Sequence, residues 1–220
     1  SFTSYGYWRL DPDGTTNEFC GDTRDECDTT DSPPAWTAAT TTTTTTVPAY
    51  PPILVDWNSS GLVATDLDGS NPRQLTTTLG DSGPVVSPDQ SMVLFHRQHG
   101  IDIQDIFVVN ADGTNERNVT NGIDYSARRL GGSWSPDSQR ITYYSNDYGD
   151  YDIYVVDADG SDHYLSTYSS DDETDPIWSE DGQWIVYWRQ EGRWDYKWYW
   201  RLDPDGTTNE YCGATREECD

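Results

Sequence analysis

Four cysteines have the residue type and spacing that most directly indicate chemistry. They form two copies of C-x6-C, in which Cys20 precedes Cys27 and Cys212 precedes Cys219. Zinc sites prefer C-x2-C spacing with histidines nearby, and neither feature is present. We therefore expect disulfides rather than a metal site, and two local loops are the simplest pairing because each copy then carries its own bridge. Disulfides form in oxidising compartments, so we expect an extracellular or cell-surface protein.

Signals for catalysis are weak by comparison. The segment GGSWS at 131–135 resembles a nucleophile elbow but lacks the closing glycine. His96, His99 and His163 have no spacing typical of a metal site or a catalytic triad, which favours ordinary surface histidines. Among 39 acidic residues some carboxylate pair always has glycosidase-like spacing, so that signal has no weight without geometry. The sequence predicts no enzymatic activity, no cofactor and no metal.

The charge of the chain restricts its partners. The 39 acidic and 13 basic residues give a formal net charge of -26. Such a chain repels nucleic acid and anionic lipid surfaces. No apolar run approaches the ~18 residues of a membrane-spanning helix. We expect neither nucleic-acid binding nor membrane insertion.

Residues 29–52 have the composition of a stalk. Proline and alanine flank a threonine run that cannot build an apolar core. Such composition is typical of stiff, O-glycosylated stalks, and a plain disordered linker fits it equally well. Either interpretation separates residues 1–28 from the region that begins at residue 53. The threonines are Thr40, Thr41, Thr42, Thr43, Thr44, Thr45 and Thr46.

From residue 53 onward the chain is an internal repeat. The segments VVSPDQSMVLF, WSPDSQRITYY and WSEDGQWIVYW recur 44 to 48 residues apart, and they precede QDIFVVNADG, YDIYVVDADG and KWYWRLDPDG. Apolar residues alternate or cluster over short runs bounded by turn residues, with no helical period. A period in the forties with about four strands per unit is the pattern of propeller blades. The sequence predicts an all-β fold.

A [DN]-x-D-G tetrapeptide ends every second strand of the repeat. An Asp-Gly pair supplies the positive backbone angles of a tight hairpin, and the aspartate accepts local backbone N–H bonds. A calcium loop also begins with D-x-D-G, but the glutamate at its twelfth position is missing in every copy, which favours the turn. The five copies are Asp11/Asp13/Gly14, Asp66/Asp68/Gly69, Asn110/Asp112/Gly113, Asp157/Asp159/Gly160 and Asp203/Asp205/Gly206.

The segment WSPDSQRITYYSNDYGDYDIYVVDADGSDHYLST resembles the TolB-type, WD40-like β-propeller repeat. The resemblance implies blades of four antiparallel strands and a tendency toward protein–protein contacts, but it implies no activity. The first unit, residues 53–78, has no S-P-D strand ahead of it, and only three units are complete. A closed ring needs four to eight blades. We therefore expect a propeller-like array that is incomplete or is completed by a neighbouring subunit.

The two ends of the chain carry nearly the same twenty residues. Residues 8–27 read WRLDPDGTTNEFCGDTRDEC and residues 200–219 read WRLDPDGTTNEYCGATREEC. The repeats differ at Phe19/Tyr211, Asp22/Ala214 and Asp25/Glu217. Equivalent environments would explain the identity, either in a tandem array or through docking of one subunit's N-terminal hairpin on its neighbour. Duplication of a blade within a monomer is the remaining interpretation.

Aromatic residues are concentrated beside these repeats. Trp194, Tyr196, Trp198 and Trp200 alternate along one predicted strand and so share a face. That face is either an exposed platform for sugar rings or part of the core between blades. The N-terminal counterparts are Tyr5, Tyr7 and Trp8. We expect Tyr5, Tyr7, Trp8, Trp198 and Trp200 to take part in assembly.

These observations predict three regions: an N-terminal hairpin with a C-x6-C bridge at 1–28, a stalk at 29–52 and a propeller-like domain at 53–220. We expect a non-enzymatic subunit of an extracellular filament or fibrous array, assembled with itself head to tail. The alternative is a secreted carbohydrate- or protein-binding propeller. Two N-glycosylation sequons, at Asn58 and Asn118, and the threonine run are predicted to carry covalent glycans.

Overall fold

The computed structural model describes residues 51–100, 103–120, 127–190 and 197–219, together with the backbone of residues 7–10 and 17–21. Contacts divide the chain into two units, residues 1–45 and 46–220. In the first unit, β1 (Tyr7–Leu10) and β2 (Asn17–Gly21) form an antiparallel hairpin. Thr40 to Thr46 lie outside the described residues.

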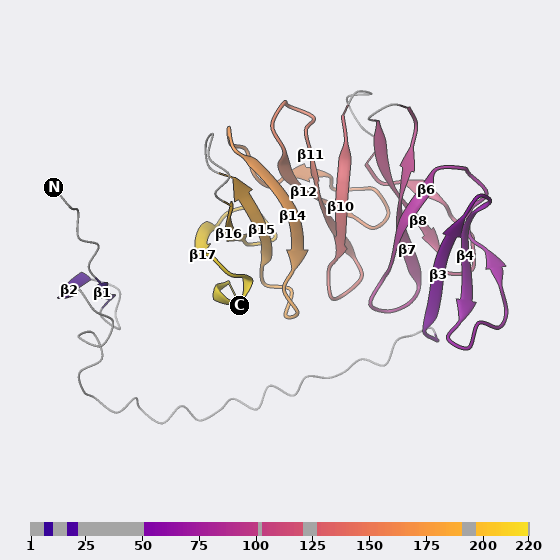
Figure 1. Ribbon diagram of the computed structural model, residues 1–220, viewed down its shortest axis with the longest axis horizontal. Coiled ribbons are helices and arrows are strands. Elements are labelled where there is room, and N and C mark those ends of the chain that lie inside the picture. The colour runs from indigo at the N-terminus through magenta and orange to yellow at the C-terminus, as the bar shows by residue number, and fades with distance from the viewer. Residues whose placement is uncertain are drawn as a thin grey trace. The chain divides into compact units, whose positions relative to one another are not determined.

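The second unit contains four antiparallel sheets in chain order (Figure 1). Sheet 1 is formed by β3 (Ile53–Asn58), β4 (Gly61–Asp66) and β5 (Arg73–Gln74). Sheet 2 is formed by β6 (Asp81–Val86), β7 (Met92–Gln98), β8 (Gln104–Asn110) and β9 (Arg117–Asn118). Sheet 3 is formed by β10 (Arg129–Trp134), β11 (Arg140–Ser145), β12 (Asp152–Asp157) and β13 (Tyr164–Leu165). Sheet 4 is formed by β14 (Asp172–Trp178), β15 (Ile185–Gln190), β16 (Lys197–Leu202) and β17 (Asn209–Gly213), and the 3-10 helix η2 (Arg216–Glu218) follows it.

The sheets lie side by side in the order of the sequence, with sheet 1 and sheet 4 at opposite ends (Figure 1). The prediction of an all-β array of four-stranded antiparallel blades is confirmed, and the array formed by the described residues is open. Sheet 1 has three strands because it lacks a strand before β3, which agrees with the S-P-D strand that is missing from the first repeat unit. In the described ranges, no helix has the length and apolar character needed to cross a membrane.

The turn between the last two strands of each sheet has the predicted chemistry. Gly69, Gly113, Gly160 and Gly206 have φ angles from 69° to 89°. The aspartate just before three of these glycines accepts the backbone N–H two residues further on, at 2.8 to 2.9 Å. At Gly113 a Cβ atom would lie 2.8 Å from the carbonyl oxygen of Gln74 in the neighbouring sheet. Glycine is therefore required there by both the backbone angle and the close approach of sheet 1.

Apolar side chains fill the space between neighbouring sheets. Burying one such side chain contributes about 2 kcal/mol, so the order of the sheets is fixed mainly by these three interfaces. The cores are Ile53, Leu62, Ala64, Leu75, Val93, Phe95, Phe107, Val109 and Ala111 between sheets 1 and 2; Leu94, Ile106, Val108, Val119, Trp134, Ile141, Tyr143, Tyr154, Val156 and Ala158 between sheets 2 and 3; and Ile153, Val155, Trp178, Ile185, Tyr187 and Leu202 between sheets 3 and 4.

One hydrogen bond recurs at all three interfaces. A side chain on the fourth strand of each sheet, or on β5 in sheet 1, donates to a carbonyl in the Asp-Gly turn of the next sheet. Arg73 Nε donates to Ala111 O at 2.9 Å, and Arg117 Nε donates to Ala158 O at 2.8 Å. Between sheets 3 and 4 the hydroxyl of Tyr164 donates to the carbonyl of Pro204. The repeated bond sets the register of each sheet against its neighbour.

Candidate functional site

The hairpin at the end of sheet 4 repeats the N-terminal hairpin in its backbone register as well as in its sequence. Each paired position in β1–β2 has its counterpart in β16–β17 at an offset of 192, since 200 − 8 = 192, and the register is irregular after the first pair in both. The pairs are Tyr7↔Gly21, Trp8↔Phe19, Arg9↔Glu18 and Leu10↔Asn17 in the first hairpin, and Tyr199↔Gly213, Trp200↔Tyr211, Arg201↔Glu210 and Leu202↔Asn209 in the second.

The second hairpin occupies a position beside β15 that we call the hairpin seat, formed by Tyr164, Ile185, Tyr187 and Arg189. Strand β16 pairs with β15 along its whole length, from Lys197 to Leu202. Leu202 is fully buried in the core between sheets 3 and 4, opposite Ile185. The apolar anchor of the hairpin is therefore a side chain that both repeats have in common.

Polar contacts fix the hairpin on the seat. The hydroxyl of Tyr187 donates to Asn209 Oδ1 at 2.7 Å. The guanidinium carbon of Arg189 lies 4.7 Å from the centre of the Trp200 ring, which is cation–π geometry. The Tyr164 bond to the turn carbonyl completes the set. The seat therefore recognises a Trp, a Leu and an Asn at fixed positions of a hairpin.

A disulfide closes the loop after β17. The predicted bond between Cys212 and Cys219 is present, and Cys219 is 1% exposed. Arg201 connects this loop to the sheet, because it donates to the carbonyl of Cys219 at 2.8 Å and forms an ion pair with Glu210 at 2.6 Å. The side chain of Cys20, on β2, and the whole of Cys27 lie outside the described residues.

The predicted aromatic strand has two different faces. Trp200 points toward sheet 3 and packs against the core there, so the interpretation as inter-blade core is correct for this residue. Trp198 lies on the same side of β16, half-buried, with its ring centre 6.0 Å from that of Tyr211. For Tyr7 and Trp8 only the strand backbone is described, whereas Tyr5, Trp194 and Tyr196 lie outside the described residues.

Sheet 4 also has aromatic residues on its opposite, outer face. Trp188 and Tyr199 pack there with ring centres 3.7 Å apart, beside the exposed Lys197. Sequence reasoning missed this pair because it followed the tryptophans at alternate positions of one strand. The signal was present: Trp188 follows Tyr187, and aromatics at adjacent positions of a strand must point to opposite faces.

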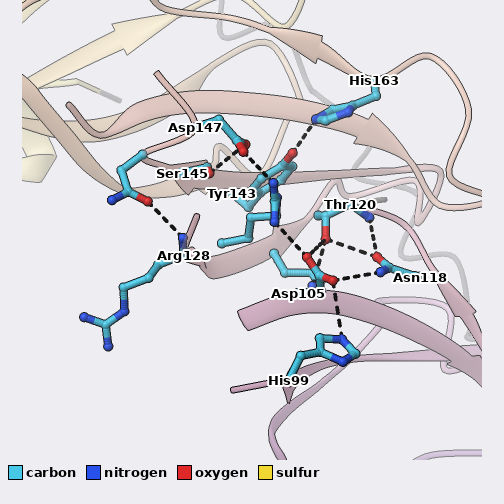
Figure 2. A network of polar contacts seen from close by, with 12 residues as sticks. His99, Asp105, Asn118, Thr120, Arg128, Tyr143, Ser145, Asp147 and His163 are labelled. Atoms are coloured by element: carbon cyan, nitrogen blue, oxygen red, sulfur yellow. Dashed lines mark hydrogen bonds and ion pairs between the residues drawn. The ribbon is translucent and has the colours of Figure 1, made fainter. Parts of the chain in front are cut away.

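A buried polar network joins sheets 2 and 3 (Figure 2). Arg129, 1% exposed, donates to Asp105 Oδ1 at 2.9 Å and also contacts Asp147. Ser145 donates to the other oxygen of Asp147 at 2.8 Å, and His99 Nε2 lies 3.4 Å from Asp105 Oδ2. A cation this deeply buried between two carboxylates holds the sheets together and is not presented to a substrate.

Tyr143 and His163 form a second contact in the same region (Figure 2). Burial raises the pKa of Tyr143 well above 10, so the phenol keeps its proton, and burial lowers the pKa of His163, which favours the neutral ring as acceptor. In sheet 4 the equivalent tyrosine, Tyr187, bonds Asn209 in the same way. Because asparagine takes the place of histidine there, the contact is a repeated tie between strands rather than an activated catalytic pair.

The histidines singled out in the sequence lie in three separate contacts. His96 Nε2 lies 2.6 Å from the carbonyl oxygen of Gly131, and burial lowers the pKa of His96. His99 and His163 contact Asp105 and Tyr143, respectively. In the part of the chain that the structure describes, no group of three or more His, Cys, Asp or Glu side chains is arranged to hold a metal ion.

Two buried acids occupy the corresponding position between sheets 3 and 4. Asp152 is 2% exposed and accepts the backbone N–H of Ser169 at 3.2 Å; Glu173 is 1% exposed and accepts the Ser169 hydroxyl at 3.1 Å. They are the counterparts of Asp105 and Arg129 in the repeat. Burial raises the pKa of Asp152 to about 6 and also raises that of Glu173. An attractive pair at one interface is thus replaced by two acids at the next.

The two sequon asparagines differ in accessibility. Asn58 ends β3 and is exposed, with its Oδ1 accepting the N–H of Ser60 at 2.7 Å. Asn118 is half-buried, and its Nδ2, the atom that a glycan would modify, donates to Asp105 at 3.0 Å (Figure 2). The geometry therefore favours Asn58 over Asn118 as the glycan acceptor.

Comparison with family models and with curated proteins gives no match. Among solved structures, TolB from Agrobacterium tumefaciens is 23% identical with a TM-score of 0.58, over 72% of this chain and 59% of that one. A puromycin-hydrolyzing peptidase of Mycobacterium tuberculosis is 18% identical with a TM-score of 0.56, over 69% of this chain and 25% of that one. Oligogalacturonate lyase from Vibrio parahaemolyticus is 14% identical with a TM-score of 0.56, over 71% of this chain and 46% of that one.

These similarities establish the fold and nothing further. The chain has a TolB-like β-propeller fold, as its repeat motif predicts, and it spans 59% or less of each of these structures. The same fold occurs in a peptidase and in a lyase, so it does not indicate one activity. The open array of sheets corresponds to an incomplete propeller.

Proposed function

We propose that this chain is a non-enzymatic structural unit of an extracellular fibrous array, joined head to tail through its terminal repeats. The observation that carries the proposal is the shared register of β1–β2 and β16–β17, because the sequence thus has one such hairpin before and one at the end of a single globular unit. Equivalent hairpins let successive units meet through the same contact, and a head-to-tail contact between identical units generates rings or open filaments.

Two further features support a structural role. The buried side chains of Arg129 and Tyr143 lie between sheets, where their contacts with Asp105 and His163 serve as ties. The disulfide at Cys212 and Cys219 suits a secreted protein, whose small terminal elements gain stability from local bridges.

Immunogold electron microscopy of native extracellular material, with an antibody raised against the globular region, tests this function. We expect the label to follow fibres at regular intervals. The matched control is the same antibody pre-absorbed with the purified chain. Label confined to dispersed single particles would contradict a structural role.

The outer face of sheet 4 favours one alternative, a carbohydrate-binding propeller. The stacked Trp188 and Tyr199 beside Lys197 form an aromatic surface of the kind that packs on sugar rings. A glycan array probed with the purified chain distinguishes the two functions. Binding that is lost in Trp188→Ala and kept in Trp198→Ala, whose ring is on the opposite side of the sheet, would establish the alternative.

A further inference from the structure

We propose that the N-terminal hairpin of residues 7–21 closes the last sheet of a neighbouring copy of this unit, in the seat that β16–β17 occupies beside β15 here. This inference rests on the proposed function and names the joint by which the array is built. Its occupant is a segment of this same sequence, so the fit can be judged residue by residue.

The N-terminal hairpin keeps each residue type through which the C-terminal hairpin contacts the seat. Trp200 and Leu202 supply the apolar anchor, and Asn209 accepts the bond from Tyr187. Gly206, with a φ of 69°, passes close to sheet 3, since a Cβ there would lie 3.3 Å from the carbonyl oxygen of Ser166. The corresponding residues are Trp8, Leu10, Gly14 and Asn17.

The three differences between the repeats avoid the seat. Tyr211, Ala214 and Glu217 are all exposed in the C-terminal hairpin. Replacing them with the N-terminal residues therefore removes no buried contact. The one tight approach in the loop, where a Cβ at Gly213 would collide with the Glu218 side chain, is preserved by glycine and glutamate at 21 and 26. The residues that are identical in the two repeats therefore include those that contact the seat, as expected if both hairpins bind to the same surface.

The free edge of sheet 1 is a poorer place for the hairpin, although the missing leading strand suggests it. Strand β3 is an edge strand, but two of its amides are already engaged by side chains. The N–H of Ile53 donates to Gln90 Oε1 at 3.2 Å, and the N–H of Trp57 donates to Asp56 Oδ1 at 2.8 Å. Pro51 and Pro52 precede the strand and supply no donors. These side chains therefore make the edge of sheet 1 less able to pair with an added strand.

The number of seats decides how the array is joined. One globular unit has one seat and is flanked by two hairpins that fit it. The C-terminal hairpin reaches the seat through a short connection after β15, and this tether gives it a high effective concentration over a hairpin from another chain. An array in which every hairpin has a seat has a 192-residue period, since 219 − 27 = 192, with residues 8–27 in the seat of a neighbouring copy. The threonine-rich segment then connects successive globules.

Four full-length variants test the seat: the unaltered chain, Leu10→Asp, Trp200→Ala/Leu202→Asp, and the triple variant. The double substitution disables the resident hairpin, so the seat becomes available to the N-terminal one. We expect Leu10→Asp to leave the melting temperature of the unaltered chain unchanged. In the double-variant background it should lower the melting temperature by about 5 °C or more, because it removes the replacement hairpin. The double variant should also form oligomers as its concentration rises, and the triple variant should not.

An equal effect of Leu10→Asp in both backgrounds would overturn the inference. So would a double variant that is unfolded whether or not Leu10 is present, since the N-terminal hairpin is required to rescue it. The matched control Tyr211→Phe gives an exposed position of the resident hairpin the residue of the N-terminal repeat. It keeps the ring beside Trp198 and Trp200 and should leave all four melting temperatures unchanged. If the N-terminal hairpin does not rescue the double variant but native material contains labelled fibres, docking in the seat is refuted and the structural function stands. If the hairpin rescues the double variant but native material contains no labelled fibres, only the structural function is refuted.

Discussion

Replacing Asp152 with asparagine should stabilise the protein at neutral pH, and the gain should disappear in acid. In the folded state burial raises the pKa of Asp152 from 3.8 to about 6, and the neighbouring charges of Asp150 and Asp172 act in the same direction. The carboxyl is therefore more easily protonated in the folded than in the unfolded chain. Well below pH 3.8 it is neutral in both states and costs nothing. As the pH rises from 3.8 to 6, ionisation increasingly disfavours the folded state.

The pKa difference sets the size of the effect. About two units at 1.36 kcal/mol each give an upper limit of about 3 kcal/mol above pH 6. Asparagine keeps an acceptor for the backbone N–H of Ser169 and carries no charge, so it should recover most of that penalty. Removing the charge also relieves Glu173, whose pKa the Asp152 carboxylate raises.

Urea unfolding of the unaltered chain and Asp152→Asn at pH 4, 5, 6, 7 and 8 measures this directly. The difference in free energy of unfolding should be below about 1 kcal/mol at pH 4 and should reach about 2 to 3 kcal/mol at pH 7. Asp105→Asn is the matched control at the same position of sheet 2, where the carboxylate contacts Arg129 at 2.9 Å, and it should destabilise at pH 7. A gain from Asp152→Asn that does not vary with pH, or a loss at pH 7, would refute the reasoning.

Three further outcomes are expected. Arg129→Met should destabilise by about 3 to 5 kcal/mol in chemical denaturation because it leaves two carboxylates without their buried cation, and a cost below about 1 kcal/mol would show that the network is not structural. Tyr187→Phe should cost about 1 kcal/mol through the lost bond to Asn209, while Tyr168→Phe, at an 81% exposed position, should cost nothing measurable. Non-reducing peptide mapping should find Cys20 joined to Cys27, and a bond from Cys20 to Cys219 would contradict the local pairing.

Much of the fold could be predicted from the sequence because its determinants are local. Strand, turn and period follow from residues that are near neighbours in the chain. The aspartates of the Asp-Gly turns bond to N–H groups two residues away, so the turn did not depend on the rest of the molecule. The same is true of the bond between Cys212 and Cys219, which closes a loop of adjacent sequence.

The sequence could not predict which face of β16 is buried. Alternation places Trp200 and Tyr199 on opposite sides of the strand, but both are aromatic, so the pattern does not say which side meets sheet 3. Only the packing of the sheets buries Trp200 and leaves Tyr199 with Trp188 on the outer face. The candidate seat depends on that choice.

The sequence by itself determined the β-strand units, their turns and the equivalence of the two terminal hairpins, because each is encoded within a few tens of residues. The tertiary structure alone decided which charges meet across the sheets. Asp105 meets Arg129, while the same position one repeat later brings Asp152 near Glu173. Partners from successive repeats are brought together by sheet stacking, and their interaction depends on burial, which no local pattern specifies.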